Sequence, residues 1–392
     1  VGRATVVVPP ACAAEASLVP GVEVRSAPDL RHVVDALEGR RRWTRPPARS
    51  APAKAVARAA DLADVRGQPL GRLAVEVAAA GAHHLLMVGP PGAGKTMLAE
   101  RLPGLLPDLT PEEALEVTRI HSAAGLPLPS GVLVTRPPFR APHQSASPVS
   151  LVGGGGAQMR PGELSCAHHG VLFLDELGEF PTDVLDTLRQ PLEDGQVLVC
   201  RARASMTFPA RILLVAAMNP CPCGRERGPG SCRCRESAKA RYAARISGPL
   251  LDRFDLRIFI DRPEVGELIG AAPVPDLPAA ESTAVVAARV AAARRRAAAR
   301  GVAANAAIPG HRLDAAAPLE PGAAALLESR LRQGQLSARG LHRVRRVART
   351  ICDLAGWEGP VRTEDVYGAL ALRAPLFSAE PVGGDYGRAG AA

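Results

Sequence analysis

The stretch Gly89-Pro-Pro-Gly-Ala-Gly-Lys-Thr96 has the glycine spacing and the terminal Lys-Thr pair of a phosphate-binding loop. An apolar run at 85–88 precedes it and predicts a buried strand, and a helix-compatible segment follows at 97–102. Lys95 can reach the β and γ phosphates, and the Thr96 hydroxyl can bind Mg²⁺. The alternative is a glycine-rich turn with an exposed lysine, and the order of strand, loop and helix argues against it. The predicted ATP-binding residues are Gly89, Pro90, Pro91, Gly92, Ala93, Gly94, Lys95, Thr96 and Met97.

A second apolar run, at 171–174, ends in the two acids Asp175 and Glu176. In a doubly wound sheet, acids at the carboxyl end of a buried parallel strand lie beside the phosphate loop. We expect Asp175 to hold Mg²⁺ and Glu176 to polarise the attacking water. Taken alone, an Asp-Glu pair after a strand is typical of a helix N-terminus. The phosphate-binding loop earlier in the chain favours the catalytic interpretation.

A third predicted strand, at 212–217, is followed by Asn219 and Pro220. The side chain of Asn219 is therefore expected at the same sheet edge, where it could orient the lytic water or contact the γ phosphate. The alternative is a turn-forming Asn before Pro, which is a common pairing.

Composition limits the class of protein. The 392 residues carry a net charge of +9 with a pI near 9.6, which favours a polyanionic partner. Aromatic residues make up only 3% of the chain, while Ala, Gly, Pro and Arg are abundant. The sequence has no uninterrupted run of 18 apolar residues and no signal-peptide pattern at Val1-Gly2-Arg3. We therefore expect a cytoplasmic protein without a membrane partner.

Eight sequence stretches together resemble the magnesium-chelatase-like AAA+ ATPases of the YifB/ComM type, and the resemblance covers nearly the whole chain. Besides the phosphate-binding loop they are Asp64-Val-Arg-Gly-Gln68, Phe139-Arg-Ala-Pro-His143, Arg160-Pro-Gly-Glu163, Val171-Leu-Phe-Leu-Asp-Glu-Leu177, Leu188-Arg-Gln-Pro-Leu-Glu-Asp-Gly195, Ala217-Met-Asn-Pro-Cys-Pro-Cys-Gly224 and Ser247-Gly-Pro-Leu-Leu-Asp-Arg-Phe-Asp255. The resemblance implies an α/β AAA+ P-loop NTPase core, a parallel sheet flanked by helices, with a helix-2 insert, a pre-sensor hairpin and a small α-helical lid domain.

The domain organisation follows from the resemblance and from composition. Residues 1–39 alternate strand and helix but are too few to bury a core, and they look like the tail of a truncated Lon-protease-like amino-terminal domain. The further expected divisions are a linker at 40–60, the ATPase core at 61–265, an Ala/Arg-rich connector at 266–305, the helical lid at 306–375 and a flexible tail at 376–392.

Two arginines match family positions that act on ATP. Arg253 matches the arginine finger, which one subunit supplies to the site of its neighbour, so the resemblance implies a ring, a homohexamer. An ion pair with Asp252 or Asp255 is the alternative role. Arg339 matches the second sensor at the start of a lid helix. Four further arginines of that helix are expected to be solvated or salt-bridged, namely Arg343, Arg345, Arg346 and Arg349.

Two inserts are expected to face the pore of the ring. The stretch 136–163 resembles the helix-2 insert, and the glycine run at 153–156 is expected to make it mobile. The stretch 196–210 alternates in the manner of a β-hairpin that turns near Ala204 and Ser205. Arg201 and Arg203 are then candidates for contacts with DNA phosphates. Arginines that serve only solubility are the alternative.

Four cysteines lie within fourteen residues and suggest a structural zinc site: Cys221, Cys223, Cys232 and Cys234. Cys-x-Cys spacing is less usual for zinc than Cys-x₂-Cys, so free thiols or a redox pair stay open as alternatives. The other cysteines, Cys12, Cys166, Cys200 and Cys352, are expected to be buried. Two histidine pairs, 83–84 and 168–169, lack a carboxylate or thiol at metal-binding spacing, which indicates structural roles.

The sequence thus predicts an ATP- and Mg²⁺-dependent ring motor that acts on single-stranded or branched DNA, with branch migration as the implied activity. A chelatase-type motor that remodels a protein partner is the alternative. A non-catalytic interaction module is disfavoured, because the chain carries the full set Lys95, Asp175, Glu176 and Arg253.

Overall fold

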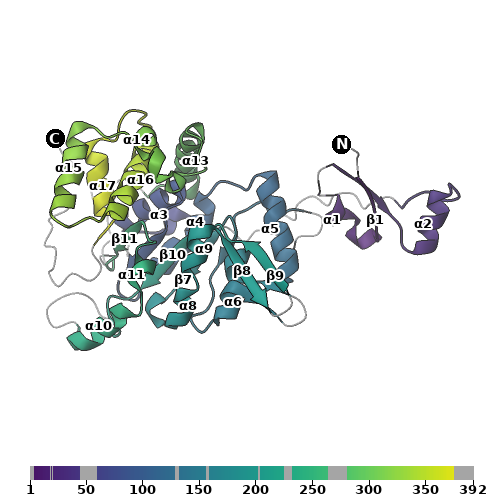
Figure 1. Cartoon of the computed structure of the whole chain (residues 1–392), viewed down its shortest axis with the longest axis horizontal. Coiled ribbons are helices and arrows are strands. Elements are labelled where there is room, and N and C mark those ends of the chain that lie inside the picture. Colours follow the sequence, from purple (N-terminus) through teal and green to yellow (C-terminus); the bar gives the residue numbers. More distant parts are fainter. Residues whose placement is uncertain are drawn as a thin grey trace.

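A five-stranded parallel sheet forms the centre of the molecule (Figure 1). The computed structural model describes residues 4–17, 19, 21–44, 60–128, 132–155, 159–201, 204–224, 232–263 and 280–374. The sheet order is β11-β3-β10-β7-β4. Its strands are β3 Leu85–Val88, β4 Phe139–Arg140, β7 Val171–Leu174, β10 Leu213–Met218 and β11 Leu256–Phe259. Every neighbouring pair is parallel, which confirms the predicted α/β fold with a parallel sheet.

Helices cover both faces of this sheet, which explains why its inner strands are apolar runs. In β3, Leu85 and Met87 belong to one apolar cluster and Leu86 and Val88 to the other. The helices of the core are α3 Pro69–Gly81, α4 Lys95–Leu105, α5 Pro111–Ala124, α6 Pro148–Val152, α7 Glu163–Cys166, α8 Thr182–Asp186, α9 Arg189–Asp194, α10 Glu236–Ala244 and α11 Gly248–Leu251.

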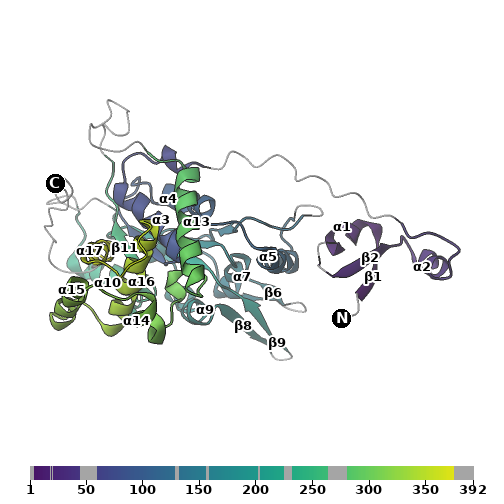
Figure 2. The same cartoon turned by 90° about the horizontal axis from the view of Figure 1, so that it is seen from above.

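The carboxyl-terminal helices gather against one side of the core (Figure 2). They are α13 Thr283–Ala299, α14 Leu313–Ala316, α15 Pro321–Arg332, α16 Ala338–Leu354 and α17 Thr363–Ala371. Buried residues of these helices share one apolar cluster with α3, α4 and the sheet. Within the described ranges, no helix combines the length and the hydropathy that crossing a lipid bilayer requires.

Helix α13 lies inside the stretch that the sequence analysis took as a connector. Val286, Val290, Ala293 and Ala297 are buried along one side of it, and the helix packs on α3, α4 and α16. Alanine has the highest intrinsic helix propensity, so a segment rich in Ala and Arg forms a helix readily. The described part of 266–305 is therefore a packed element of the carboxyl-terminal helices.

The amino-terminal residues form a small β/α unit, drawn to one side of the main body in Figure 1. Strands β1 Ala4–Val8 and β2 Val22–Ser26 pair in parallel, and helices α1 Ala13–Ala16 and α2 Leu30–Leu37 follow them. The order strand, helix, strand, helix is the predicted one. The assignment of this unit to a larger domain stays a prediction.

The expected hairpin is present but turns at a different place. Strands β8 Gln196–Arg201 and β9 Ala204–Pro209 are antiparallel, with Arg201 opposite Ala204 and Cys200 opposite Ser205. The predicted turn near Ala204 and Ser205 is therefore wrong, because both residues belong to β9. Val197, Val199 and Phe208 anchor the hairpin in the core.

The insert at 136–163 contains short strands and a helix within its described residues. Its strand β4 forms an edge of the central sheet, and β5 Gly153–Gly154 pairs with β6 Arg160–Pro161. A Cβ on Gly153 would lie 2.6 Å from the carbonyl oxygen of Arg160, so this glycine permits the close approach of strands β5 and β6. Residues 156–158 lie outside the described ranges.

Two histidines before β3 join the sheet to its neighbours. His83 Nε2 lies 2.8 Å from the hydroxyl of Thr350 in α16, and its Nδ1 lies 3.4 Å from Asp255. His84 Nδ1 accepts a hydrogen bond from the backbone amide of Leu214, at 3.0 Å. Burial lowers the pKa of His84 to about 4, so the ring is neutral in the folded protein near neutral pH.

We expect His84 to make the protein less stable in mild acid. The pKa of His84 in the folded protein lies below its unfolded value of about 6.5. Between these two pKa values the unfolded chain binds a proton at His84 and the folded chain does not. Stability then falls as pH drops below about 6.5, by about 2 kcal/mol between pH 7 and pH 5. His84→Asn keeps an acceptor but does not titrate. Urea unfolding of both proteins at the two pH values checks this, and an unchanged pH dependence in the variant contradicts it.

Candidate active site

The strand order brings the predicted catalytic residues to one edge of the sheet. Strand β10 lies between β3 and β7, so Asn219, which follows β10, stands between the phosphate-binding loop after β3 and Asp175 after β7. Parallel strands present their carboxyl ends to the same side, where open α/β sheets bind ligands. Three segments that are far apart in sequence therefore meet in one site.

The loop between β3 and α4 has the backbone of a phosphate cradle. Gly92 and Gly94 have φ angles of +79° and +86°, a conformation that favours glycine. A Cβ on Gly89 would lie 2.0 Å from the carbonyl oxygen of Ile260, so only glycine fits this close approach. Helix α4 begins at Lys95, and its free amino-terminal amides favour an anion.

Lys95 is buried within this loop. Its ammonium donates to the carbonyl oxygens of Gly89 at 2.6 Å and Pro90 at 2.9 Å, and to Asn219 Oδ1 at 3.4 Å. Burial lowers the pKa of Lys95, while the negative charges of Asp175 and Glu176 oppose this shift. The lysine is thus held by acceptors that a phosphate group can replace.

The Thr96 hydroxyl donates to Asp175 Oδ2 at 2.8 Å. A hydroxyl and a carboxylate oxygen are the hard ligands that Mg²⁺ prefers, so this pair fits the predicted cation. The other oxygen of Asp175 accepts from the backbone amide of Glu176 at 2.9 Å. Glu176 is exposed and has a φ of +52°, a strained conformation that is common at functional sites.

Two contacts to the loop were missed by the sequence analysis. Gln68 Nε2 donates to the carbonyl oxygens of Ala93 at 3.0 Å and Asp261 at 2.5 Å, and Gln68 itself has a φ of +82°. Arg262 Nε donates to the carbonyl oxygen of Pro91 at 3.1 Å. Gln68 belongs to one of the quoted motifs, but only the fold shows that it clamps the loop from outside.

Arg253 pairs with an acid that was not foreseen. Its Nη2 donates to Glu193 Oε2 of α9 at 2.5 Å, and neither Asp252 nor Asp255 is the partner seen here. Arg343 of α16 donates to the carbonyl oxygen of Arg253 at 3.1 Å and to Asp255 Oδ1 at 2.5 Å. The carboxyl-terminal helices therefore hold the backbone of the segment that carries Arg253.

The remaining arginines of α16 divide into two groups. Arg339 is exposed in the first turn, which Ser337 caps by accepting from the amide of Gly340. The expected salt bridges are present for Arg343, Arg345 and Arg349, whereas Arg346 contacts a backbone carbonyl instead. Arg345 pairs with Asp314, Arg349 pairs with Asp353, and Arg346 donates to the carbonyl oxygen of Ile308.

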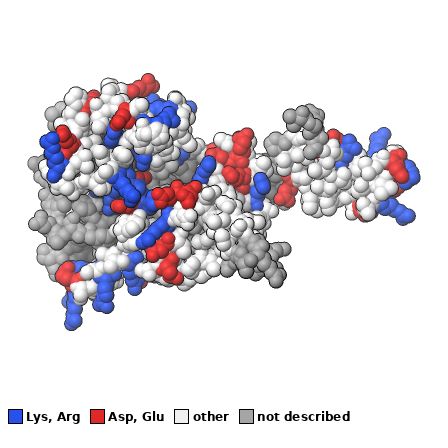
Figure 3. Space-filling model, in the orientation of Figure 1, with Lys and Arg blue, Asp and Glu red and all other residues white. Residues whose placement is uncertain are grey.

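Of the two candidate DNA contacts, Arg201 is the last residue of strand β8. Arg203 and the side chain of Arg201 fall outside the described residues. On the face shown in Figure 3, acidic and basic side chains are mixed over most of the body, and Lys and Arg gather at the lower edge over α10. Exposed cations of this region include Arg233, Arg235 and Arg241.

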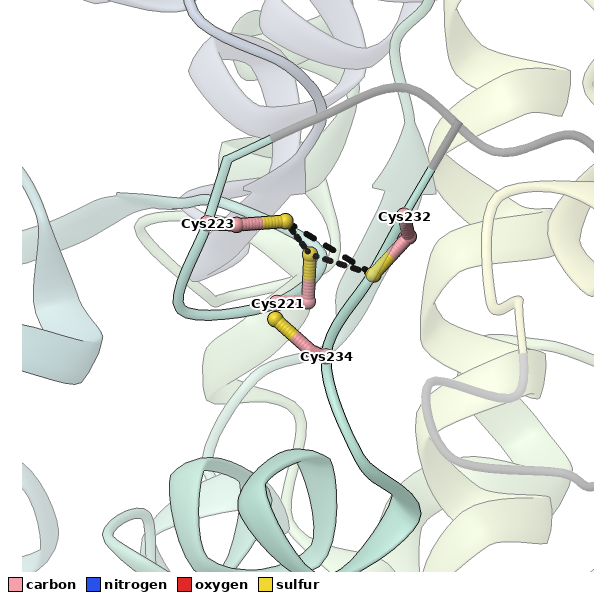
Figure 4. Close-up of side chains that lie close together, drawn as sticks. All are labelled: Cys221, Cys223, Cys232 and Cys234. Carbon is pink, nitrogen blue, oxygen red and sulfur yellow. Dashed lines mark hydrogen bonds between the residues drawn. The ribbon is translucent and has the colours of Figure 1, made fainter. Parts of the chain in front are cut away.

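The four clustered cysteines converge on one point (Figure 4). The sulfur of Cys221 lies 3.2 Å from that of Cys223 and 3.5 Å from that of Cys232, and the Cys223 and Cys232 sulfurs are 3.6 Å apart. All four sulfurs, including that of Cys234, lie within 4.8 Å of one another. Of the other cysteines, Cys166 and Cys352 are buried as expected, whereas Cys12 and Cys200 are exposed, so that expectation was wrong for them.

The histidine pair 168–169 does have a carboxylate nearby, contrary to the sequence analysis. Glu116 Oε2 lies 3.1 Å from His168 Nε2 and 3.3 Å from His169 Nε2. His168 Nδ1 accepts from the amide of Arg211, so the neutral ring carries its proton on Nε2 and shares it with Glu116. That proton occupies His168 Nε2, so His168 takes part in a hydrogen-bond network with Glu116 and Arg211.

Comparison with known proteins gives two consecutive family matches. Residues 61–268 match the family described as magnesium chelatase, subunit ChlI, and residues 280–373 match its carboxyl-terminal family. An uncharacterized protein of Mycobacterium tuberculosis is 48% identical over 95% of this chain and 73% of its own length. The uncharacterized protein YifB of Escherichia coli is 46% identical over 87% of this chain and 65% of its own length. Competence protein ComM of Haemophilus influenzae is 44% identical over 76% of this chain and 57% of its own length.

Proposed function

Because the chain belongs to the family of magnesium chelatase subunit ChlI, and thus to the AAA+ ATPases of the YifB/ComM type, we propose that it is an ATP-hydrolysing ring motor that acts on DNA in the cytoplasm. The observation that carries the ATPase part is the meeting of Lys95, Thr96, Asp175 and Asn219 at one sheet edge.

We assign the steps of hydrolysis to these residues. Lys95 and the loop amides would bind the phosphates, and Thr96 and Asp175 would hold Mg²⁺, which supplies positive charge to neutralise the phosphates when bound. Glu176 accepts a proton from the attacking water, and Asn219 positions that water or the γ phosphate. Arg339 reaches the nucleotide from the lid.

We propose a homohexamer in which Arg253 completes the site of the neighbouring subunit. An arginine supplied in trans stabilises charge that develops on the γ phosphate, and this requires subunits to meet at the site. In the single chain Arg253 pairs with the exposed Glu193 instead.

The DNA part of the proposal has separate support. The net charge of +9 and the hairpin β8–β9, with Arg201 at the end of β8 and Arg203 next in sequence before β9, suit contact with phosphates but not the reading of bases. One relative carries the printed name competence protein ComM. We infer a helicase that promotes branch migration during recombination. The other candidate, remodelling of a protein partner, is favoured by the chelatase name of the family.

Steady-state ATP hydrolysis with and without DNA tests the proposal. We expect both single-stranded DNA and a four-way junction to stimulate turnover, and Lys95→Ala to abolish it in every condition, because the ammonium that binds the phosphates is lost. Turnover that is indifferent to both DNAs would contradict the DNA part and favour a protein-remodelling motor.

A further inference from the structure

We propose that Cys221, Cys223, Cys232 and Cys234 bind one zinc ion, and that this site fixes the Asn219 loop beside the phosphate-binding loop. The metal site itself is independent of the proposed function. Its effect on catalysis rests on the proposed ATP hydrolysis.

The sulfur positions suit a single tetrahedral metal. Zinc–thiolate bonds of about 2.3 Å place the sulfurs of a tetrahedron about 3.8 Å apart. The three sulfur separations of 3.2, 3.5 and 3.6 Å, with all four sulfurs within 4.8 Å, come close to this arrangement. The sulfurs of a disulfide lie about 2.05 Å apart, and none of these four cysteines is in a disulfide. The compact spacing favours one ion over a cluster of several irons.

The local backbone brings each Cys-x-Cys pair into position. The amide of Gly224 donates to the carbonyl oxygen of Cys221 at 3.0 Å and closes a turn that places the sulfurs of Cys221 and Cys223 on one side. Cys232 and Cys234 lie just before α10, and their sulfurs point at the first pair (Figure 4). The unusual spacing that weakened the sequence argument is thus compatible with a tetrathiolate site.

The first half of the site touches the phosphate-binding loop. Cys221 follows Asn219 by two residues and is buried. A Cβ on Gly224 would lie 3.1 Å from Pro91 Cγ and 3.6 Å from Asn219 Nδ2. The cysteine turn therefore backs directly onto Pro91 and onto the side chain of Asn219.

Helix α10, which follows the second pair of cysteines, contacts the residues that come after Asp175 and Glu176. The ring of Tyr242 in α10 packs on Gly178, and its hydroxyl lies beside the backbone of Asn219, which acts to lower the pKa of that hydroxyl. Arg245 donates to the carbonyl oxygen of Gly178 at 2.6 Å. Burial raises the pKa of Tyr242 to about 12, so this hydroxyl stays protonated. Zinc would therefore join two segments that both hold Asn219.

Loss of the metal should release Asn219 while leaving the ATP-binding groups in place. We expect kcat for ATP to fall about 10- to 100-fold, the usual effect of losing groups that orient a ligand, with little change in ATP affinity. Asn219→Ala should lower kcat to a similar degree. In the double variant with Cys223→Ser the two losses should not multiply, because both changes remove the same interaction.

The experiment compares tag-free wild type, Cys223→Ser, Cys234→Ser and the control Cys200→Ser, an exposed cysteine of β8 outside the cluster. Metal content by mass spectrometry, absorption of the cobalt-substituted protein, circular dichroism, ATP binding and kcat are measured for each. We expect one zinc ion per chain and a tetrahedral thiolate spectrum in the wild type and in Cys200→Ser. Either ligand variant should keep the fold and lose both the metal and most of kcat.

Each of the other outcomes contradicts one named part of the proposal: the metal site, its link to Asn219, or the proposed ATP hydrolysis. Wild-type protein that hydrolyses ATP without bound zinc overturns the site, and so does zinc that survives in both ligand variants. Folded ligand variants that lose zinc but keep full kcat, or double variants whose losses multiply, overturn the link to Asn219. Wild-type protein that binds zinc but never hydrolyses ATP contradicts the proposed function and leaves the metal site supported.

Discussion

Glu176→Gln is expected to lower the rate of ATP hydrolysis about 100-fold or more, because a positioned general base contributes on this scale. The amide cannot accept a proton from water, yet it keeps the size of the side chain. Glu176 is exposed and its side chain is not part of the packed core, so the variant should fold normally. Initial rates of phosphate release, together with the affinity for a fluorescent ATP analogue, provide the measurement.

A matched acid close by gives the control for this prediction. Glu179 is also exposed, lies three residues further along, and pairs with Arg245 at 3.3 Å. Glu179→Gln should change the turnover only slightly, because exposed ion pairs contribute little. Equal losses in both variants, or undiminished turnover in Glu176→Gln, would assign the proton transfer to another group.

Arg253→Ala is expected to lower kcat about 1,000-fold if the guanidinium reaches the neighbouring site, since arginine fingers contribute at least this much. The variant should still bind ATP, because the phosphate-binding loop of its own chain is unchanged. Arg332→Ala, which removes an exposed arginine from α15, is the matched control and should behave as wild type.

Two further measurements separate a finger from a merely structural arginine. Glu193→Gln removes the ion pair seen in the single chain, and we expect it to keep most of the activity. Mixing Arg253→Ala with Glu176→Gln should restore part of the activity, because some interfaces then combine an intact base with an intact arginine. If Glu193→Gln is as damaging as Arg253→Ala, and mixing restores nothing, Arg253 acts within its own chain.

Much of the fold was accessible from the sequence because buried parallel strands have a simple signature. Strands β3 and β7 occupy the predicted residues 85–88 and 171–174, since a strand covered on both faces must be apolar throughout. The meeting of Lys95, Asp175 and Asn219 also followed, because strand ends at one sheet edge require only the order of motifs. The hairpin existed as predicted, but its turn was displaced because alternation does not define the residue at which a chain reverses.

Contacts between side chains that are far apart in the sequence could not be predicted from it. The partner of Arg253 is sixty residues away on α9, and Glu116 is more than fifty residues from the histidines that it contacts. No periodic pattern connects such positions, because they meet only after the elements pack. Helix α13 had a usable signal, since Val286, Val290, Ala293 and Ala297 recur at helical spacing, but alanine contributes little to an apolar pattern.

The apolar cluster that runs from the sheet into the carboxyl-terminal helices makes these two parts one folding unit. Leu85 of β3, Val290 of α13 and Val344 of α16 are fully or almost fully enclosed in the same cluster. A chain shortened after residue 263 would expose that interior to water and invite aggregation. Heat should therefore melt the nucleotide-binding sheet and the helices beside it together, and a mutation deep in either part weakens both.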